Sequence, residues 1–133
     1  MRIVLAFAFA VMTATTATSA AEVAIPERYH GSWQPTEMGT PPGCAANDAD
    51  IRIRINTNTV DLHEGQCTVR EAATQDDNSV QVRSDCGQED SAWAADEQWS
   101  LAPDADGSES YLVIAGRSAA TGDYRYVYGR CTE

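Results

Sequence analysis

The sequence predicts an all-β fold, a small antiparallel β-barrel or barrel-like sandwich of about eight strands with two disulfides. Apolar and polar residues alternate with period two along most of the chain, and helical periodicity is weak throughout. Turn-forming residues separate the alternating segments at short, regular intervals, which is typical of small barrels and sandwiches. Closing the sheet also removes the exposed strand edges that invite aggregation.

The expected strands can be placed in order along the chain. They cover residues 31–35, 50–56, 59–64, 67–73, 80–86, 99–101, 111–116 and 124–131. The clearest is 50–56, where three isoleucines alternate with two arginines. Short polar segments separate most of the others, and the sequence Pro-Asp-Ala-Asp-Gly at 103–107 is a typical hairpin turn.

The fourth and fifth expected strands form a hairpin whose register can be estimated. If Ala73 faces Val80, then Cys67 faces Cys86. Residues 87–97, which follow this hairpin, are rich in acidic side chains and carry Trp93. We expect them to form an acidic loop.

The N-terminus has the three-part layout of a secretory signal peptide. Arg2 supplies a positive charge, residues 3–12 are an unbroken apolar run, and residues 13–21 are small and polar. The apolar run is shorter than the roughly 20 residues that span a bilayer. We therefore expect a signal peptide over 1–20 with cleavage after Ala20 or Ala21, a single domain over 21–133, a periplasmic or secreted location, and no stable membrane insertion.

The charge composition argues against nucleic-acid binding. The chain has 20 acidic residues and 9 basic ones, all arginine, which gives a net charge of −11. Nucleic acids and anionic lipids are bound through basic side chains, so this surface would repel both. A partner of this protein is expected to be basic or indifferent to charge.

Four cysteines, Cys44, Cys67, Cys86 and Cys131, follow the expected signal peptide. An even number in an oxidising compartment predicts two disulfides. A zinc site is not expected, because the cysteines are far apart in sequence and the chain has only two histidines. The hairpin register favours Cys67–Cys86, which leaves Cys44–Cys131.

The sequence Gly31-Ser32-Trp33, together with Arg130 in the last expected strand, resembles the lipocalin and wider calycin pattern. The resemblance implies that Trp33 closes one end of a barrel and that Arg130 stacks on it, a structural role worth about 0.5–2 kcal/mol. Because this barrel would be shorter than a lipocalin, we expect little room for a cavity.

The cysteine spacing is similar to that of the bacterial inhibitors of secreted serralysin-type metalloproteases, which are exported eight-stranded barrels. Cys44 and Cys67 have 22 residues between them, and a G-x-W lies near the expected mature N-terminus. The resemblance implies Cys44–Cys67, leaving Cys86–Cys131, and we prefer this pairing slightly. It also implies that the N-terminal residues Ala21, Glu22 and Val23 enter a protease cleft.

Three tyrosines, Tyr124, Tyr126 and Tyr128, share one face of the last expected strand. Two orientations are open. If the face carrying Cys131 points inward, the tyrosines point outward and form an aromatic strip suited to recognition. In the other orientation they belong to the core, which we favour. They are candidate binding residues in the first case.

Catalytic and metal motifs are absent from the sequence. It has neither G-x-S-x-G nor H-E-x-x-H. His63 and Glu64 would point to opposite faces of a strand, and the Asp104 segment has the wrong glycine spacing for a calcium loop. We therefore expect no enzyme activity, no cofactor and no metal.

These observations together favour an exported binding protein. Its best-motivated specific role is inhibition of a secreted hydrolase, which would be its protein partner. The alternatives are an envelope-associated structural domain and a carrier of a small ligand.

Overall fold

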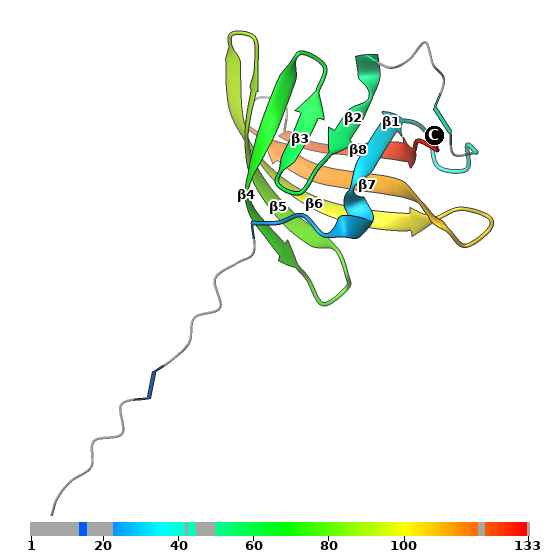
Figure 1. Ribbon diagram of the computed structural model, residues 1–133, viewed down its shortest axis with the longest axis horizontal. Helices are drawn as coiled ribbons and strands as arrows, with labels where there is room; N and C mark the ends of the chain where they lie inside the picture. Colours follow the sequence, from blue (N-terminus) through cyan, green and yellow to red (C-terminus); the bar gives the residue numbers. More distant parts are fainter. Residues whose placement is uncertain (1–13, 16–22, 42, 45–49, 120–121, 133) are drawn as a thin grey trace, which may run out of the picture.

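Eight antiparallel strands close into a barrel in simple meander order, so that each strand pairs with its neighbours in sequence and β8 pairs with β1 (Figure 1). The structure is a computed structural model that describes residues 14–15, 23–41, 43–44, 50–119 and 122–132. The expected signal peptide and its cleavage site lie outside this part, apart from residues 14–15. A 3-10 turn, η1, precedes the strands. The elements are η1 Glu27–Tyr29, β1 Gly31–Pro35, β2 Ile53–Ile55, β3 Thr59–Leu62, β4 Gly65–Thr74, β5 Val80–Gln88, β6 Ser91–Pro103, β7 Glu109–Ser118 and β8 Gly122–Arg130.

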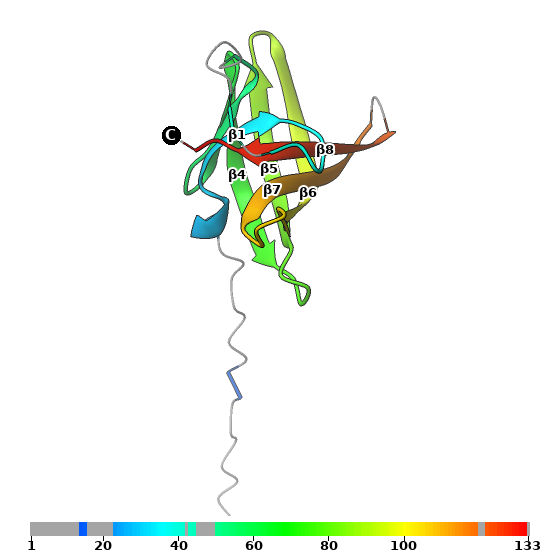
Figure 2. The ribbon, with the colours of Figure 1, turned by 90° about the vertical axis from the view of Figure 1, so that its right-hand side faces the viewer.

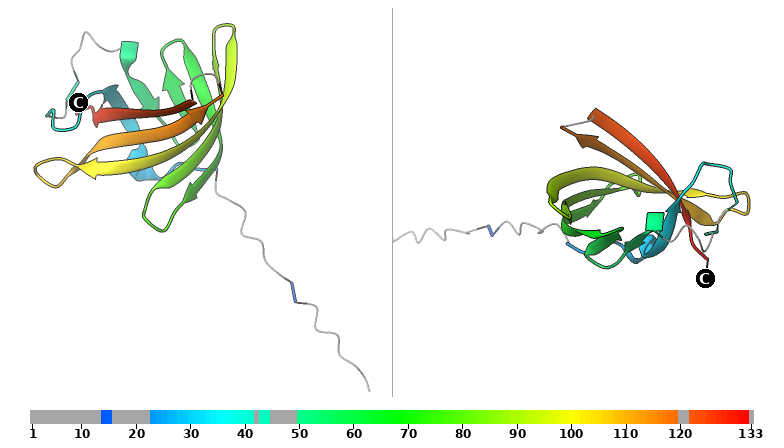
Figure 3. Two further views of the ribbon diagram at one scale, coloured as in Figure 1. Left: turned by 180° about the vertical axis from the view of Figure 1, so that it is seen from behind. Right: turned by 90° about the horizontal axis from the view of Figure 1, so that it is seen from above.

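The strands differ greatly in length. β1, β2 and β3 have 5, 3 and 4 residues, whereas β4 to β8 have between 9 and 13. The long β7–β8 hairpin therefore reaches well past the end of β1 (Figures 2 and 3). The barrel wall is short where β1 to β3 form it and tall where β4 to β8 form it, which leaves one end of the barrel open.

Two strand predictions were wrong, and both errors have a simple cause. Residues 87–97 are not a loop: β5 and β6 continue to a tight turn at Glu89-Asp90, and Trp93 pairs with Cys86. This part of β6 is exposed, so the core imposes no alternation on it. The predicted strand 50–56 shortens to β2, because Ile51 lies outside the sheet and is 52% exposed.

The register of β4 against β5 agrees with the prediction up to Val69. A β-bulge after Val69 then shifts the pairing by one residue. Ala73 consequently pairs with Gln81 rather than Val80, and Ala72 becomes the buried alanine of this segment. The alternation of apolar residues could not reveal the bulge, because two adjacent alanines fit either register.

The closed end of the barrel is built around Trp33, which is completely buried. Its indole Nε1 donates a hydrogen bond to the carbonyl of Tyr29 at 2.9 Å, and the guanidinium carbon of Arg130 lies 4.2 Å from its ring centroid. Arg130 also donates hydrogen bonds to the carbonyls of Arg28 (2.7 Å) and His30 (3.1 Å). These contacts fix η1 across the seam between β1 and β8.

The disulfides join Cys67 to Cys86 and Cys44 to Cys131. The preferred pairing, Cys44–Cys67 with Cys86–Cys131, is therefore wrong. Cys67 and Cys86 are directly opposed on β4 and β5, so register decides the first bridge. The 17-residue connection between β1 and β2 is long enough for Cys44 to reach Cys131 just beyond β8. Two disulfides indicate a non-cytoplasmic environment.

A close backbone contact at Gly65 predicts that a larger residue at this position destabilises the barrel. A Cβ at this position would lie 2.5 Å from the carbonyl oxygen of Gly87, in a central strand that pairs on both sides. Gly65→Ala should therefore lower the free energy of unfolding by about 1–3 kcal/mol, the usual range for overpacking. The matched control is Gly87→Ala, whose Cβ would have no neighbour closer than 3.8 Å. Chemical denaturation of both variants measures the difference, and equal stabilities would contradict the prediction.

Candidate functional site

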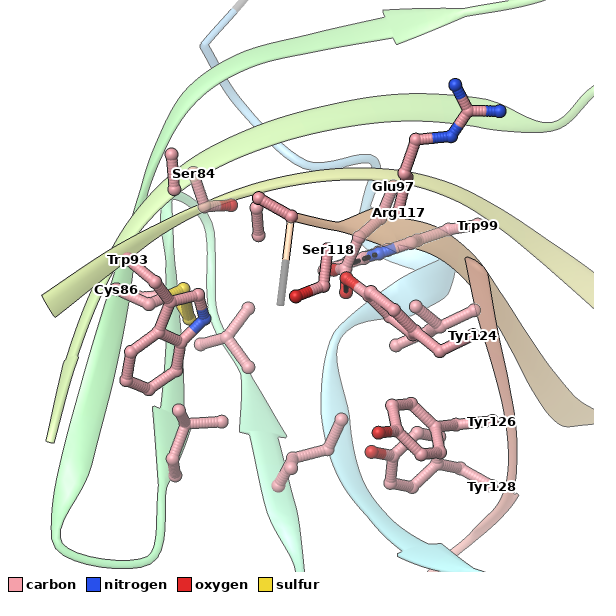
Figure 4. A pocket seen from close by; sticks show the side chains of 18 residues that line it. Ser84, Cys86, Trp93, Glu97, Trp99, Arg117, Ser118, Tyr124, Tyr126 and Tyr128 are labelled. Carbon is pink, nitrogen blue, oxygen red and sulfur yellow. Dashed lines mark hydrogen bonds between the residues drawn. A yellow bond between two sulfur atoms is a disulfide. The ribbon is translucent and has the colours of Figure 1, made fainter. Parts of the chain in front are cut away.

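The open end of the barrel leads into a cavity of about 630 Å³. Its wall comes from β2 to β8, so nearly the whole barrel contributes to it (Figure 4). Most of the lining is apolar or aromatic, and the Cys67–Cys86 disulfide forms part of it. The expectation of little room inside the barrel was wrong, because the short strands β1 to β3 leave the interior uncovered on one side.

The three tyrosines of β8 face this cavity. Residues that pair across antiparallel strands point to the same side, and Tyr126 pairs with the buried Ile114 while Tyr128 pairs with the buried Leu112. The outward orientation is therefore wrong. Tyr124 and Tyr128 pack against the core, whereas Tyr126 is 54% exposed at the cavity mouth.

The tyrosine rings form a continuous aromatic surface. The ring centroids of Tyr124 and Tyr126 are 5.3 Å apart, and those of Tyr126 and Tyr128 are 6.5 Å apart with an edge-on arrangement. Both separations lie in the range of favourable aromatic pairs. Tyr124 leans over Gly116, where a Cβ would come within 2.4 Å of its ring. A glycine at this position thus lets the tyrosine lie flat against β7.

A single carboxylate, that of Glu97, takes part in this aromatic wall. Its Oε2 accepts a hydrogen bond from the hydroxyl of Tyr124 at 2.6 Å, and its Oε1 accepts one from the indole Nε1 of Trp99 at 3.2 Å. Glu97 comes from the segment that was predicted to be a loop, so it was missed as a site residue. The alternation of Trp93, Ala95, Glu97 and Trp99 was the signal that could have placed it on an inner strand face.

The environment of Glu97 also affects the tyrosines. Burial, together with the negative charge of Glu97, raises the pKa of Tyr128 to about 12. The pKa of Tyr124 is raised further, by burial first and then by its hydrogen bond to Glu97. Both hydroxyls are therefore neutral over the physiological pH range; that of Tyr124 donates to Glu97, and that of Tyr128 can act as a hydrogen-bond donor in the cavity.

The opposite wall of the cavity is apolar. Val60 and Leu62 of β3 and Ile53 of β2 line the cavity on strands that do not pair with β8. Trp93 stands at the rim beside Cys86 and is 41% exposed. A large exposed aromatic side chain at the mouth of an apolar cavity is typical of a ligand-binding site.

The basic side chain at the rim is directed away from the interior. The guanidinium of Arg117 is 81% exposed and lies 2.9 Å from the carboxylate of Asp123. Figure 4 shows it pointing away from the tyrosines. Among the described residues, Arg117 therefore forms its ion pair with Asp123 and not with Glu97.

The other candidate residues lie elsewhere. Trp33 and Arg130 occupy the closed end of the barrel. Ala21 and Glu22 lie outside the described residues, and Val23 is exposed. The His63–Glu64 pair and the Asp104 segment both lie in turns between strands.

His63 and Glu64 form the turn between β3 and β4, with 3.8 Å between the imidazole Nε2 and the carboxylate Oε1. The expectation that they sit on opposite strand faces was therefore wrong. Asp104 closes its hairpin turn by accepting hydrogen bonds from the backbone of Asp106 and Ser108 and from the hydroxyl of Ser110. Its oxygens thus have a structural role in the turn.

In the part of the chain that the structure describes, groups of three or more histidine, cysteine or acidic side chains placed to hold a metal ion are absent. No helix in the described ranges has the length and apolar character needed to cross a membrane.

The chain matches no known family model, no curated protein and no solved structure.

Proposed function

We propose that this protein is an exported, periplasmic or secreted, binding protein that holds a small, largely apolar molecule in the barrel cavity. The observation that carries the proposal is the cavity of about 630 Å³ with its aromatic wall. Sites for drug-sized ligands and cofactors have volumes of about 300–1,000 Å³ and are lined mainly by apolar and aromatic side chains with a few polar groups. The cavity agrees with that description in both size and lining.

Several features of the cavity favour ligand binding over a purely structural role. Exposed large apolar side chains carry a cost in water, and here Tyr126 and Trp93 gather at one opening. The interior side chains are held by strand pairing and by the Cys67–Cys86 disulfide, so the site is preformed. A preformed apolar site loses little conformational entropy when a ligand enters.

The cavity contains little that could catalyse a reaction. Its carboxylate, Glu97, already accepts two hydrogen bonds, and both tyrosines beside it have raised pKa values. His63 lies in the β3–β4 turn and is not part of the cavity lining. These properties support a binding protein. Inhibition of a secreted hydrolase through the N-terminal residues stays a prediction.

Filling the cavity should abolish ligand binding while leaving the fold intact. Ala95 is buried on the inner face of β6 and lines the cavity. Ala95→Trp should reduce the affinity for the uncharged fluorophore N-phenyl-1-naphthylamine at least tenfold, because the indole would occupy the space that the fluorophore needs. Fluorescence titration of wild type and variant measures this change.

The matched control is Ala92→Trp, which places the same side chain at an exposed position outside the cavity lining on the same strand. This variant should bind the fluorophore within twofold of wild type. The proposal fails if wild type does not bind the fluorophore in a 1:1 ratio, or if Ala95→Trp binds it as well as Ala92→Trp does.

A further inference from the structure

The carboxylate of Glu97 affects which kind of ligand the cavity can bind. Glu97 is a carboxylate in a mainly apolar and aromatic lining, and its two hydrogen-bond donors, Tyr124 and Trp99, are both neutral. A carboxylate has about four acceptor positions, of which these donors use two. Arg117 points outward to Asp123 and does not neutralise the carboxylate of Glu97 (Figure 4). The interior therefore has a net negative charge.

The aromatic rings next to Glu97 strengthen the attraction for a cation. The π faces of tyrosine and tryptophan are electrically negative and attract cations, and this attraction is larger at sites shielded from water. Tyr124 and Tyr126 are adjacent, with 5.3 Å between their ring centroids, and Tyr128 follows at 6.5 Å. Trp93 adds a further ring at the rim. A carboxylate and several aromatic rings thus surround one space.

We propose that the natural ligand is an organic cation, an amine or quaternary ammonium compound with an apolar body. Its charged group would lie beside Glu97 among the tyrosine rings, and its apolar body would contact Val60, Leu62 and Ile53 on the opposite wall. The net charge of −11 on the whole chain would also attract such a ligand from solution. This inference rests on the proposed function and specifies the ligand class of the same cavity.

The test compares two molecules of the same shape that differ only in charge, benzyltrimethylammonium and its uncharged isostere neopentylbenzene. Binding of each is followed by the intrinsic fluorescence of the cavity tryptophans. Wild type should prefer the cation. Glu97→Gln keeps the shape of the side chain and removes its charge, and should weaken cation binding at least tenfold while changing neopentylbenzene binding less than twofold.

Asp96→Asn is the matched control, because it removes the same charge from the neighbouring residue on the outer face of β6. Asp96 lies 3.7 Å from Arg83 and accepts a hydrogen bond from Gln81, both outside the cavity lining. Asp96→Asn should change cation affinity less than twofold. Tyr126→Leu provides a second test if Glu97→Gln fails to fold: it keeps the wall apolar, removes a π face, and should weaken binding of the cation at least threefold but not of the isostere.

Failure of this inference can be distinguished from failure of the proposed function. If N-phenyl-1-naphthylamine and neopentylbenzene bind but the cation binds more weakly than its isostere, the cavity binds ligands and the cation assignment is wrong. If Glu97→Gln loses no more cation affinity than Asp96→Asn, the assignment is also wrong. If none of the three compounds binds to wild type, both proposals fail.

Discussion

Trp33→Ala should lower the free energy of unfolding by about 3–5 kcal/mol, the largest single-residue effect expected in this chain and the usual range for truncating a buried tryptophan. Trp33 is 0% exposed, so the substitution removes a large buried apolar surface. It also removes the ring over which Arg130 lies and the indole donor that binds the carbonyl of Tyr29. The carbonyl is then left without that hydrogen bond in a buried position, which adds to the cost.

Trp93→Ala is the matched control, because it truncates the same residue type at the open end of the barrel. Trp93 is 41% exposed and lines the cavity at its rim. Its loss should cost less than about 1 kcal/mol, as is usual for exposed positions. Urea denaturation of both variants gives the comparison. Equal losses of stability would show that Trp33 does not hold the closed end of the barrel.

Removing the Cys44–Cys131 disulfide should also lower the free energy of unfolding strongly. The bridge joins residues 87 positions apart in sequence, and in the chain-entropy model a loop of that length corresponds to about 4–5 kcal/mol of stabilisation. It also lies at the seam where the first and last strands meet, and β1 and β8 share three residue pairs there. Cys131 is attached to this seam by a backbone hydrogen bond to Ser32 at 2.9 Å.

The double variant Cys44→Ala/Cys131→Ala, compared with wild type by urea denaturation, measures this contribution. The comparison variant is Cys67→Ala/Cys86→Ala, which opens a loop of only 19 positions that the β4–β5 ladder already holds together, worth about 3 kcal/mol in the same model. Peptide mapping under non-reducing conditions checks the pairing itself. A Cys44–Cys67 peptide in wild type would contradict the pairing described above.

The strand pattern was predictable where a strand has one buried and one exposed face. Ile53 and Ile55 are buried and Arg54 between them is exposed, so period-two alternation identifies β2 correctly. The first half of β6 has no such contrast, because Ser91 to Ala94 are all exposed. Its strand conformation comes from pairing with β5, and pairing partners cannot be read from a local pattern.

The candidate site was less predictable than the fold, because it depends on which way a strand faces and on how long the neighbouring strands are. Tyrosine is favoured in strands whichever face it occupies, so propensity could not decide the direction of Tyr124, Tyr126 and Tyr128. Their pairing with β7 decides it. The cavity in turn is open because β1, β2 and β3 are short, which is a property of the closed barrel rather than of any one segment.

In the proposed function, the closed end of the barrel contributes stability and the open end binds the ligand. At the closed end, Trp33, Arg130 and η1 are tied together by hydrogen bonds and buried packing. At the open end, large aromatic side chains remain exposed around the cavity, which costs stability and is a feature of functional sites. Substitutions at the closed end should therefore reduce stability, whereas those of the exposed rim residues Trp93 and Tyr126 should change binding with little loss of stability.

Two-dimensional ¹H–¹⁵N NMR during titration with N-phenyl-1-naphthylamine tests the central claim most directly, because it reports where on the protein the ligand binds. The largest shifts should fall on the inner-facing residues of β6 and β8, from Trp93 to Glu97 and from Tyr124 to Tyr128. The backbone amides around Trp33 at the closed end should change little. Shifts confined to the closed end or to the outer face of the barrel would contradict the claim that the cavity is the binding site.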